Sequence, residues 1–325
     1  AYVFYGDTFF DTLKDPKWSG MGHEMIAFTH YYIVENGESF YLHAGESVPI
    51  EDFEVPRVRH NFKETSDDKA AWDSLMKAIA EGISSGEMTK VVSSREVEFT
   101  SETPYNVASI LANLVDNNPN CFIFGYEKDG RTFVGASPEI LVRHRGSEIL
   151  SYALAGTAPK DGPNAWTEEQ LLTNTKNIIE HNIVRDRIVN TMKQITPDVT
   201  VGETGIMELS HLYHLRTIIT AKDSTKSLVE WAKLLHPTPA LGGEPREKAL
   251  ALLQEYESHE RGMYAAPFGF MKDMGDGIVV VAIRSALIMD NILYAYAGCG
   301  VVADSDADEE YAETNNKMRT ILDAL

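Results

Sequence analysis

Acidic side chains are concentrated near the end of the chain, in a pattern that could bind a cation. The stretch AGCGVVADSDADEEYAETNNK, residues 297–317, carries six carboxylates within ten positions. If a helix begins near Ala307, Glu310 and Glu313 lie one turn apart on one face, with Lys317 a further turn along. Oxygen-only ligands suit magnesium, which takes one or two protein carboxylates together with water and an anionic substrate. A solvated acidic helix start has the same pattern, because carboxylates are favoured near helix N-termini.

Two other ligand-binding loops are excluded at this position. An EF-hand loop that starts at Asp304 needs glycine at its sixth position and glutamate at its twelfth, where this sequence has Glu309 and Asn315. A G-x-G-x-x-A dinucleotide fingerprint begins at Gly298, but such a fingerprint opens a βαβ unit, and too little chain follows it. The magnesium interpretation therefore needs a partner carboxylate elsewhere in the chain.

A second acidic position lies inside the segment TKNIIEHNIVRDRIV, residues 175–189. Its isoleucines recur at helical spacing, and Glu180 and His181 sit among them. A charge so near an apolar stripe is unusual, which makes Glu180 a candidate metal ligand. An ordinary ion pair with Arg185 or Arg187 is the structural alternative.

Composition limits the class of protein. The chain has 325 residues, of which 43% are hydrophobic, so it can bury a large core. The formal net charge of −20 argues against nucleic acid or an anionic membrane as a partner. The sequence lacks a signal-peptide pattern and an apolar run of membrane-spanning length. Its two cysteines, Cys121 and Cys299, are expected to be reduced and buried. We therefore expect a cytoplasmic protein.

The elements that must position these residues follow an α+β pattern. Antiparallel hairpins outnumber anything that could be a βαβ crossover, so we expect large antiparallel sheets flanked by helices, in a single domain over residues 1–325. The expected hairpin turns are Asn36-Gly37, Asp129-Gly130 and the vicinity of Gly146. The other expected strands cover residues 90–99, 278–289 and 292–299. Helices are expected over 66–86, 167–195, 226–235 and 245–258, and from about 307 to the end. A further helix is expected to begin at Thr103-Pro104.

Several motifs resemble those of the chorismate-utilising enzymes, which include isochorismate, salicylate, anthranilate and aminodeoxychorismate synthases. These motifs are KVV, SPEIL, EHNIVRDRI, HPTPALGG, ERGMYAAPFGF, AIRSAL and AGCGVV, and they follow the family's order and spacing from Lys90 to the end. The resemblance implies the fold of anthranilate synthase component I. Family members usually carry a longer amino-terminal part, so residues 1–65 are expected to be a shortened portion of the same sheet system.

The resemblance also implies a site. The family's magnesium ligands match Glu180 and Glu313, with Glu310 nearby, and the metal would bind the ring carboxylate of chorismate. A zinc site at His211 and His214 is disfavoured, because neither a cysteine nor a third histidine follows at ligand spacing. The implied substrate contacts are Gly156, Thr157, His214, Tyr264, Arg284, Gly298, Gly300 and Lys317.

The choice of reaction within the family depends on Lys90 and Glu139. Relatives that use water as the nucleophile carry lysine at the start of the KVV strand, and a buried lysine beside cations is favoured in the neutral form that a base requires. Glu139 matches the family's general acid. Ala155 occupies the position where aminodeoxychorismate synthases usually have lysine, which argues against that branch of the family. The resemblance thus implies magnesium-dependent conversion of chorismate to isochorismate for menaquinone synthesis, without a glutaminase subunit. There are three alternatives: a salicylate synthase, an anthranilate synthase-type subunit, and a non-catalytic cation-binding relative.

Overall fold

The computed structural model describes residues 2–51, 54–66, 68–272 and 275–325. Within them, nine strands form one antiparallel sheet, here called the large sheet. In spatial order its strands are β11 (Val199–Val201), β13 (Leu212–Lys222), β10 (Glu148–Pro159), β9 (Ile140–Arg145), β16 (Gly277–Val281), β15 (Pro267–Lys272), β1 (Tyr2–Gly6) and β2 (Glu24–Ile26), with β12 (Gly205–Glu208) paired to β13.

A second antiparallel sheet, the small sheet, contains seven of the described strands. These are β14 (Gly243–Glu244), β6 (Lys90–Ser101), β18 (Ile292–Val301), β17 (Ser285–Met289), β8 (Arg131–Ser137) and β7 (Phe122–Lys128), with β5 (Phe62–Glu64) paired to β6. The helices are α1 (Lys69–Ser84), α2 (Val107–Asn117), α3 (Glu168–Thr173), α4 (Thr175–Lys193), α5 (Leu228–Leu235), α6 (Arg246–Tyr256) and α7 (Ala307–Leu322). The expected α+β class with large antiparallel sheets flanked by helices is therefore confirmed.

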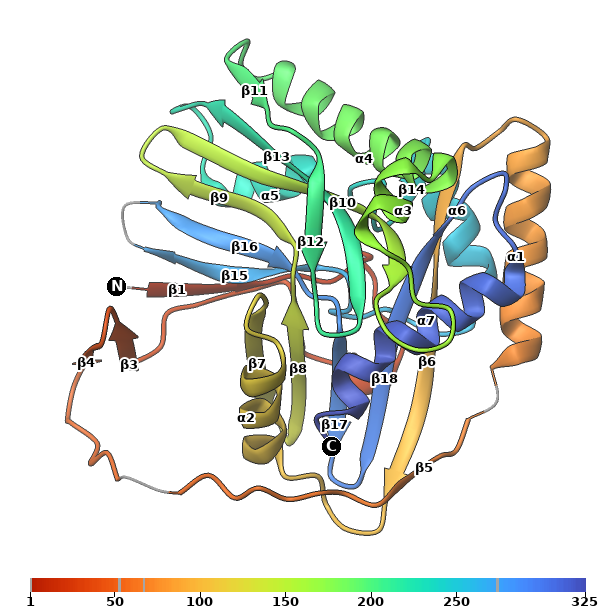
Figure 1. Cartoon of the computed structure of the whole chain (residues 1–325). Helices are drawn as coiled ribbons and strands as arrows, with labels where there is room; N and C mark the ends of the chain where they lie inside the picture. Colours follow the sequence, from red (N-terminus) through yellow and green to blue (C-terminus); the bar gives the residue numbers. More distant parts are fainter. Residues whose placement is uncertain (1, 52–53, 67, 273–274) are drawn as a thin grey trace.

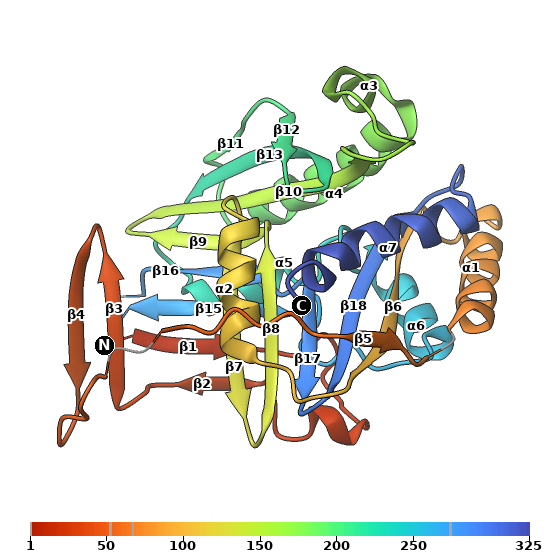
Figure 2. The same ribbon diagram turned by 60° about the horizontal axis from the view of Figure 1, so that its bottom comes forward.

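The helices cover both sheets from outside (Figure 1). Helices α4 and α5 pack on the large sheet, whereas α2 and α7 pack on the small sheet. Figure 2 shows α1 and α6 beside β6, at the far edge of the small sheet. The largest hydrophobic cluster draws residues from both sheets, including Phe133 of β8, Val279 of β16 and Leu287 of β17. The two sheets therefore share one core.

The prediction of one strand over residues 278–289 is wrong, because within this segment the chain passes from the large sheet to the small sheet. Strand β16 pairs with β9 and β15 in the large sheet, and β17 pairs with β8 and β18 in the small sheet. Between them Arg284 has a φ of 53°, a left-handed conformation that is costly for a side chain with a Cβ. Arg284 thus lies at a crossover between the sheets and is not in the middle of a strand, as AIRSAL suggested.

Two helix boundaries also differ from expectation. The helix expected over 167–195 is divided at Asn174, whose side chain accepts a hydrogen bond from the amide of Asn177 and so caps a new helix, α4. Helix α2 begins after Asn106, whose carboxamide oxygen accepts from the amide of Ser109, and not at Thr103-Pro104. Local side-chain caps decided both boundaries. Both cysteines are free, as expected, but Cys121 is only partly buried.

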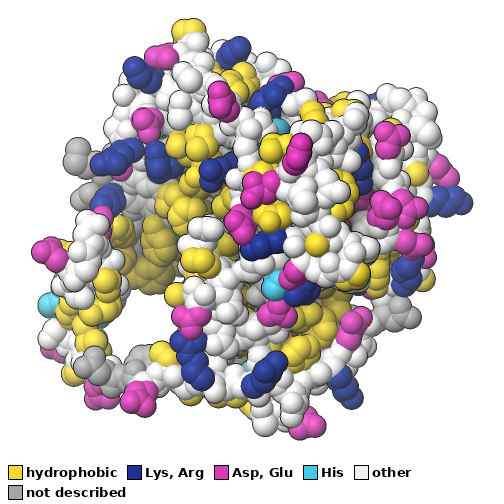
Figure 3. Space-filling view, viewed as in Figure 1, with side chains coloured by type: hydrophobic (Ala, Val, Ile, Leu, Met, Phe, Trp, Pro, Cys, Tyr) yellow, Lys and Arg dark blue, Asp and Glu magenta, His cyan; other side chains and the backbone are white. Residues whose placement is uncertain are grey.

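The first part of the chain is divided among three sheets. Strands β1 and β2 join the large sheet and β5 joins the small one, whereas β3 (His30–Glu35) and β4 (Glu38–His43) form a separate hairpin. Figure 3 shows an open space between this hairpin and the body of the molecule. Among the described residues, none of the helices combines the length and apolar character needed to cross a bilayer.

Candidate active site

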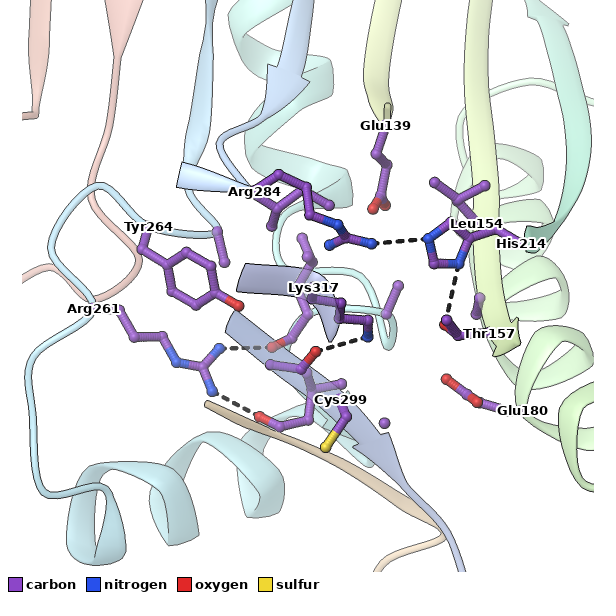
Figure 4. Close-up of a pocket in the computed structure, with 18 residues that line it drawn as sticks. Glu139, Leu154, Thr157, Glu180, His214, Arg261, Tyr264, Arg284, Cys299 and Lys317 are labelled. Carbon is purple, nitrogen blue, oxygen red and sulfur yellow. Dashed lines mark hydrogen bonds between the residues drawn. The ribbon is translucent and has the colours of Figure 1, made fainter. Parts of the chain in front are cut away.

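A small, partly open cavity lies where the two sheets meet (Figure 4). It has room for only a few water molecules, about 50 Å³, given that one water needs about 10–15 Å³. Nine of the residues predicted from the sequence line it: Glu139, Thr157, Glu180, His214, Tyr264, Arg284, Gly298, Gly300 and Lys317. Of the other four, Lys90 and Glu313 pair with the lining residues Glu180 and Lys317, and Gly156 directly precedes Thr157. Glu310 lies one turn before Glu313 on the same helix and pairs with Lys176, outside the lining. The sequence-predicted set therefore converges in space.

Two chain crossovers between the sheets carry Glu139 and Arg284 into the cavity. Glu139 lies between β8 of the small sheet and β9 of the large sheet, and Arg284 lies between β16 and β17. The crossovers are joined by hydrogen bonds, because the amide of Val281 donates to the Glu139 carbonyl at 3.0 Å and the Ser137 hydroxyl donates to the Val281 carbonyl at 2.5 Å. The acid and the guanidinium are thus held on one rigid unit.

Glu139 has the properties of a proton donor. Its side chain is 2% exposed, and its Oε1 has no hydrogen-bonding partner among the described residues. Burial raises the pKa of this carboxyl to about 8, although the charges of Arg284, Lys90 and Lys317 oppose the rise. At neutral pH most of Glu139 therefore carries its proton and can give it to a leaving group.

A hydrogen-bonded chain holds the Arg284 guanidinium. One of its terminal nitrogens donates to Nε2 of His214 at 2.8 Å, and Nδ1 of His214 lies 3.1 Å from the hydroxyl of Thr157. Burial, followed by the charge of Arg284, lowers the pKa of His214 well below its usual value, so the ring is neutral and Nε2 can accept. The buried Nε of Arg284 has no partner within the described chain, which leaves it free to bind a carboxylate.

Gly156 forms a bulge that turns the end of β10 toward the cavity. The register between β10 and β13 shifts at this residue, and its φ of +79° is one that glycine adopts without strain. An added Cβ would lie 3.1 Å from the carbonyl oxygen of Asn177. The carboxamide of Asn177 in turn accepts from the amide of Thr157 at 3.0 Å, which fixes the bulge against α4.

Lys90 and Glu180 form a buried ion pair at the other side of the cavity. Lys90 is the first residue of β6 and is completely buried, and its Nζ lies 3.0 Å from Oε1 of Glu180 on α4. Burial would raise the pKa of Glu180, but the charge and hydrogen bond of Lys90 outweigh it and the pKa is lowered. Gly300 passes so close that an added Cβ would meet the Glu180 carboxylate at 2.4 Å.

Helix α7 presents the other two carboxylates beside this pair. Glu313 lies 2.6 Å from Nζ of Lys317, and the buried Glu310 lies 2.6 Å from Nζ of Lys176. Burial raises the pKa of Glu313, and the negative charges of Glu310 and Glu180 add to the rise although Lys317 opposes it. Across the described part of the chain, no three His, Cys, Asp or Glu side chains are arranged as a metal site. Lysines, instead, neutralise the three glutamates.

A buried arginine fixes the position of α7. The Arg95 guanidinium, on β6, donates to the hydroxyl of Thr314 at 2.8 Å and to the side-chain oxygen of Asn315 at 2.7 Å. It also pairs with Asp68 and lies 3.6 Å from the centre of the Tyr311 ring. These contacts tie the helix that carries Glu310 and Glu313 to the small sheet.

Arg261 is a cavity residue that was not predicted from the sequence. Its side chain is 1% exposed, lines the cavity, and pairs with Glu257 four residues earlier. It donates to the carbonyl of Leu241 at 2.8 Å and to that of Val92 at 2.7 Å, so it supports two walls of the cavity. The acidic residue four positions before an arginine was a readable signal, but the segment was interpreted only as a loop.

Comparison with known proteins identifies the family. The fold is an α+β arrangement of two antiparallel sheets that meet at a buried cavity lined by acidic and basic side chains. Residues 43–325 match the family described as chorismate binding enzyme, to which the chain belongs. The family resemblance read from the sequence is confirmed.

Individual relatives span more than one activity. An isochorismate synthase of Bacillus subtilis, MenF, is 36% identical over 264 residues, which cover 79% of this chain and 56% of that protein. Anthranilate synthase component 1 of Arthrobacter globiformis is 35% identical over 75% of this chain and 48% of its own length. The chain thus spans about half the length of these relatives.

A solved structure confirms the fold. The menaquinone-specific isochorismate synthase MenF of Escherichia coli matches with a TM-score of 0.81, over 99% of this chain and 78% of the other, at 24% identity. At 24% identity, the match supports the arrangement of sheets and helices only.

Proposed function

We propose that this protein is an isochorismate synthase, which adds water at C2 of chorismate while the hydroxyl group leaves C4. The observation that carries the proposal is the buried Glu139 carboxyl, with a pKa of about 8 and no hydrogen-bonding partner for its Oε1 among the described residues, in the same cavity as Glu180, which pairs with Lys90. A protonated acid and a lysine directly behind another lining residue would supply the two proton transfers that the reaction requires.

Each residue has a distinct part in this mechanism. Lys90 takes a proton from the attacking water, and Glu139 gives its proton to the departing hydroxyl. Arg284, through its free Nε, binds a substrate carboxylate, and His214 fixes the guanidinium plane. The backbones of Gly298 and Gly300 allow the substrate to approach closely, since neither carries a Cβ. The remaining expected contacts, from Gly156, Thr157, Tyr264 and Lys317, belong to the same proposal.

The glutamates fit a divalent cation. Glu180 and Glu313 would hold magnesium, with Glu310 beside them, because burial and then the negative charges of Glu310 and Glu180 raise the pKa of Glu313, and a cation would stabilise the charged carboxylates. Magnesium would supply positive charge for the ring carboxylate of chorismate. A cation at Glu180 would compete with Nζ of Lys90, which lies 3.0 Å from Oε1 of Glu180.

The product decides between this activity and its alternatives. Chorismate and magnesium are incubated with the protein, with and without ammonium, and the mixture is analysed by chromatography with a coupled pyruvate assay. We expect chorismate and isochorismate to approach an equilibrium mixture, with no effect of ammonium and little pyruvate. Stoichiometric pyruvate with salicylate would identify a salicylate synthase, and anthranilate would overturn the role given to Lys90. The wording of HPTPALGG and AGCGVV supports menaquinone synthesis as the pathway, without a glutaminase subunit.

The metal assignment has its own test. E180Q and E313Q should each weaken magnesium binding measured by calorimetry, and E309Q should not, because Glu309 lies on the same helix but is exposed. Unchanged magnesium binding in both E180Q and E313Q would refute the assignment.

A further inference from the structure

A second cleft lies between the segment that follows β1 and helices α5 and α6. Its volume is about 580 Å³, within the range of about 300–1,000 Å³ that small-molecule sites occupy. Phe9, Phe10, Pro237 and Leu250 give it apolar walls, while Arg246 and Lys233 bring positive charge. The rest of the lining is largely polar and includes His23 and Gln254, so the cleft combines an apolar wall with polar groups that could orient a ligand.

Two polar side chains of the cleft lack partners. His236 is 9% exposed, and neither of its ring nitrogens has a hydrogen-bonding partner among the described residues. Arg246, the first residue of α6, is partly buried and makes no hydrogen bond or ion pair within the described part of the chain. Buried polar groups are normally hydrogen-bonded, so His236 is a candidate to bind something that enters the cleft, and Arg246 can add a positive charge near it.

The acidic residues of the cleft do not neutralise these groups. The carboxylate of Asp7 already accepts from the Tyr5 hydroxyl at 2.8 Å and from the amide of Thr8 at 2.9 Å, and it pairs with His23 at 2.5 Å. Asp11 lies at the exposed rim. Arg246 and the exposed Lys233 are therefore the cationic groups of the cleft lining that an anion could meet.

We propose that this cleft binds a small organic carboxylate with an apolar ring, its acidic group at Arg246 and Lys233 and its ring against the apolar walls. The ligand would act on the active-site cavity through Phe9. The Phe9 ring lies 5.5 Å from the ring of His236 and 4.1 Å from the guanidinium of Arg261, measured from the ring centre. Arg261 in turn lines the cavity and holds the carbonyl of Leu241, another of its lining residues.

Benzoate is a suitable probe, because it joins a carboxylate to an apolar ring. Calorimetry should detect benzoate binding to the wild-type protein, and R246Q should weaken it about tenfold or more, since a charged hydrogen bond is lost. K248Q is the matched control, because Lys248 lies on the same helical turn outside the cleft lining. Benzamide, which is neutral, and inorganic phosphate, which has no ring, should each bind more weakly than benzoate.

The active site is the competing location for benzoate. We expect R284Q to retain benzoate binding, and saturating benzoate to change chorismate turnover in the wild type but not in R246Q. Loss of binding in R284Q with retention in R246Q would overturn the proposal, as would equal binding of benzamide. Benzoate binding without any change in turnover would overturn the coupling through Phe9. Should R246Q fail to fold, the Leu250 methyl resonances of the wild-type protein must shift with benzoate, and their invariance would count against the site.

Discussion

Replacing Glu139 by glutamine tests the protonated carboxyl directly. Glutamine keeps the shape of the side chain and cannot ionise. The pKa of Glu139 rises from 4.5 to about 8 on folding, which corresponds to about 5 kcal/mol of preference for the protonated form. At pH 7 about nine-tenths of Glu139 should be protonated, so wild-type infrared spectra should contain the carbonyl band of a neutral carboxyl that E139Q lacks.

The raised pKa also predicts how stability depends on pH. A carboxyl with a raised pKa binds its proton more tightly in the folded chain, so its stabilising contribution is complete below pH 4.5 and is lost as the pH rises through 8. The free energy of unfolding of the wild type, relative to that of E139Q, should therefore fall by about 1.4 kcal/mol per pH unit between these values. Urea unfolding at pH 5, 6 and 7 measures this difference, which should change by about 3 kcal/mol in total.

A matched control is available on the surface. E169Q removes an exposed carboxyl from α3 and should leave both the infrared band and the pH dependence unchanged. Turnover should be abolished in E139Q and, in the wild type, should decline above about pH 8 as Glu139 loses its proton. An infrared difference without a neutral carboxyl band at pH 6, together with a pH-independent stability difference, would refute the reasoning.

Three further substitutions test the surroundings of the site. K90Q should reduce turnover by roughly 10²–10⁴-fold while chorismate still binds in the presence of magnesium, and near-normal turnover would show that another group is the base. G300A should reduce turnover without lowering the melting temperature much, because its methyl group would meet only the side-chain ends of Glu180 and Lys90; G205A, whose methyl group meets nothing within 4 Å, should match the wild type. R95L should lower the free energy of unfolding by about 3–5 kcal/mol, since it leaves a partly buried carboxylate unpaired, and R95K should lower it less; equal stability of R95L and wild type in urea would contradict this.

The carboxylates of α7 could be predicted because their relation is local. Glu310 and Glu313 are three residues apart, and helix geometry alone puts them on one face. Glu180 could be singled out because a charge interrupts an apolar stripe. The pairing of Glu313 with Lys317 is equally local, four residues along the same helix. The partner of Glu310 was not predictable in the same way, since Lys176 reaches it from a helix that lies far away in the sequence.

The crossover at Arg284 marks the limit of local patterns. The apolar residues on either side of it alternate alike whether they join one sheet or the other, so the sequence read as one long strand. Only pairing with β9 and β8, both far away in the chain, divides the segment between two sheets. The site residues on this crossover could be named from the family motif, whereas the backbone geometry that presents them could not.

The two joined crossovers also govern when the cavity can form during folding. Glu139 and Arg284 each stand between a strand of the large sheet and a strand of the small sheet, and the amide of Val281 bonds the two segments together. A folding intermediate with only one sheet formed would contain at most one anchored end of each segment. Contacts so distant in sequence are slow to form, because loop closure must precede them. Affinity for chorismate should therefore arise in the last, slowest kinetic phase, which makes ligand binding a reporter of sheet docking.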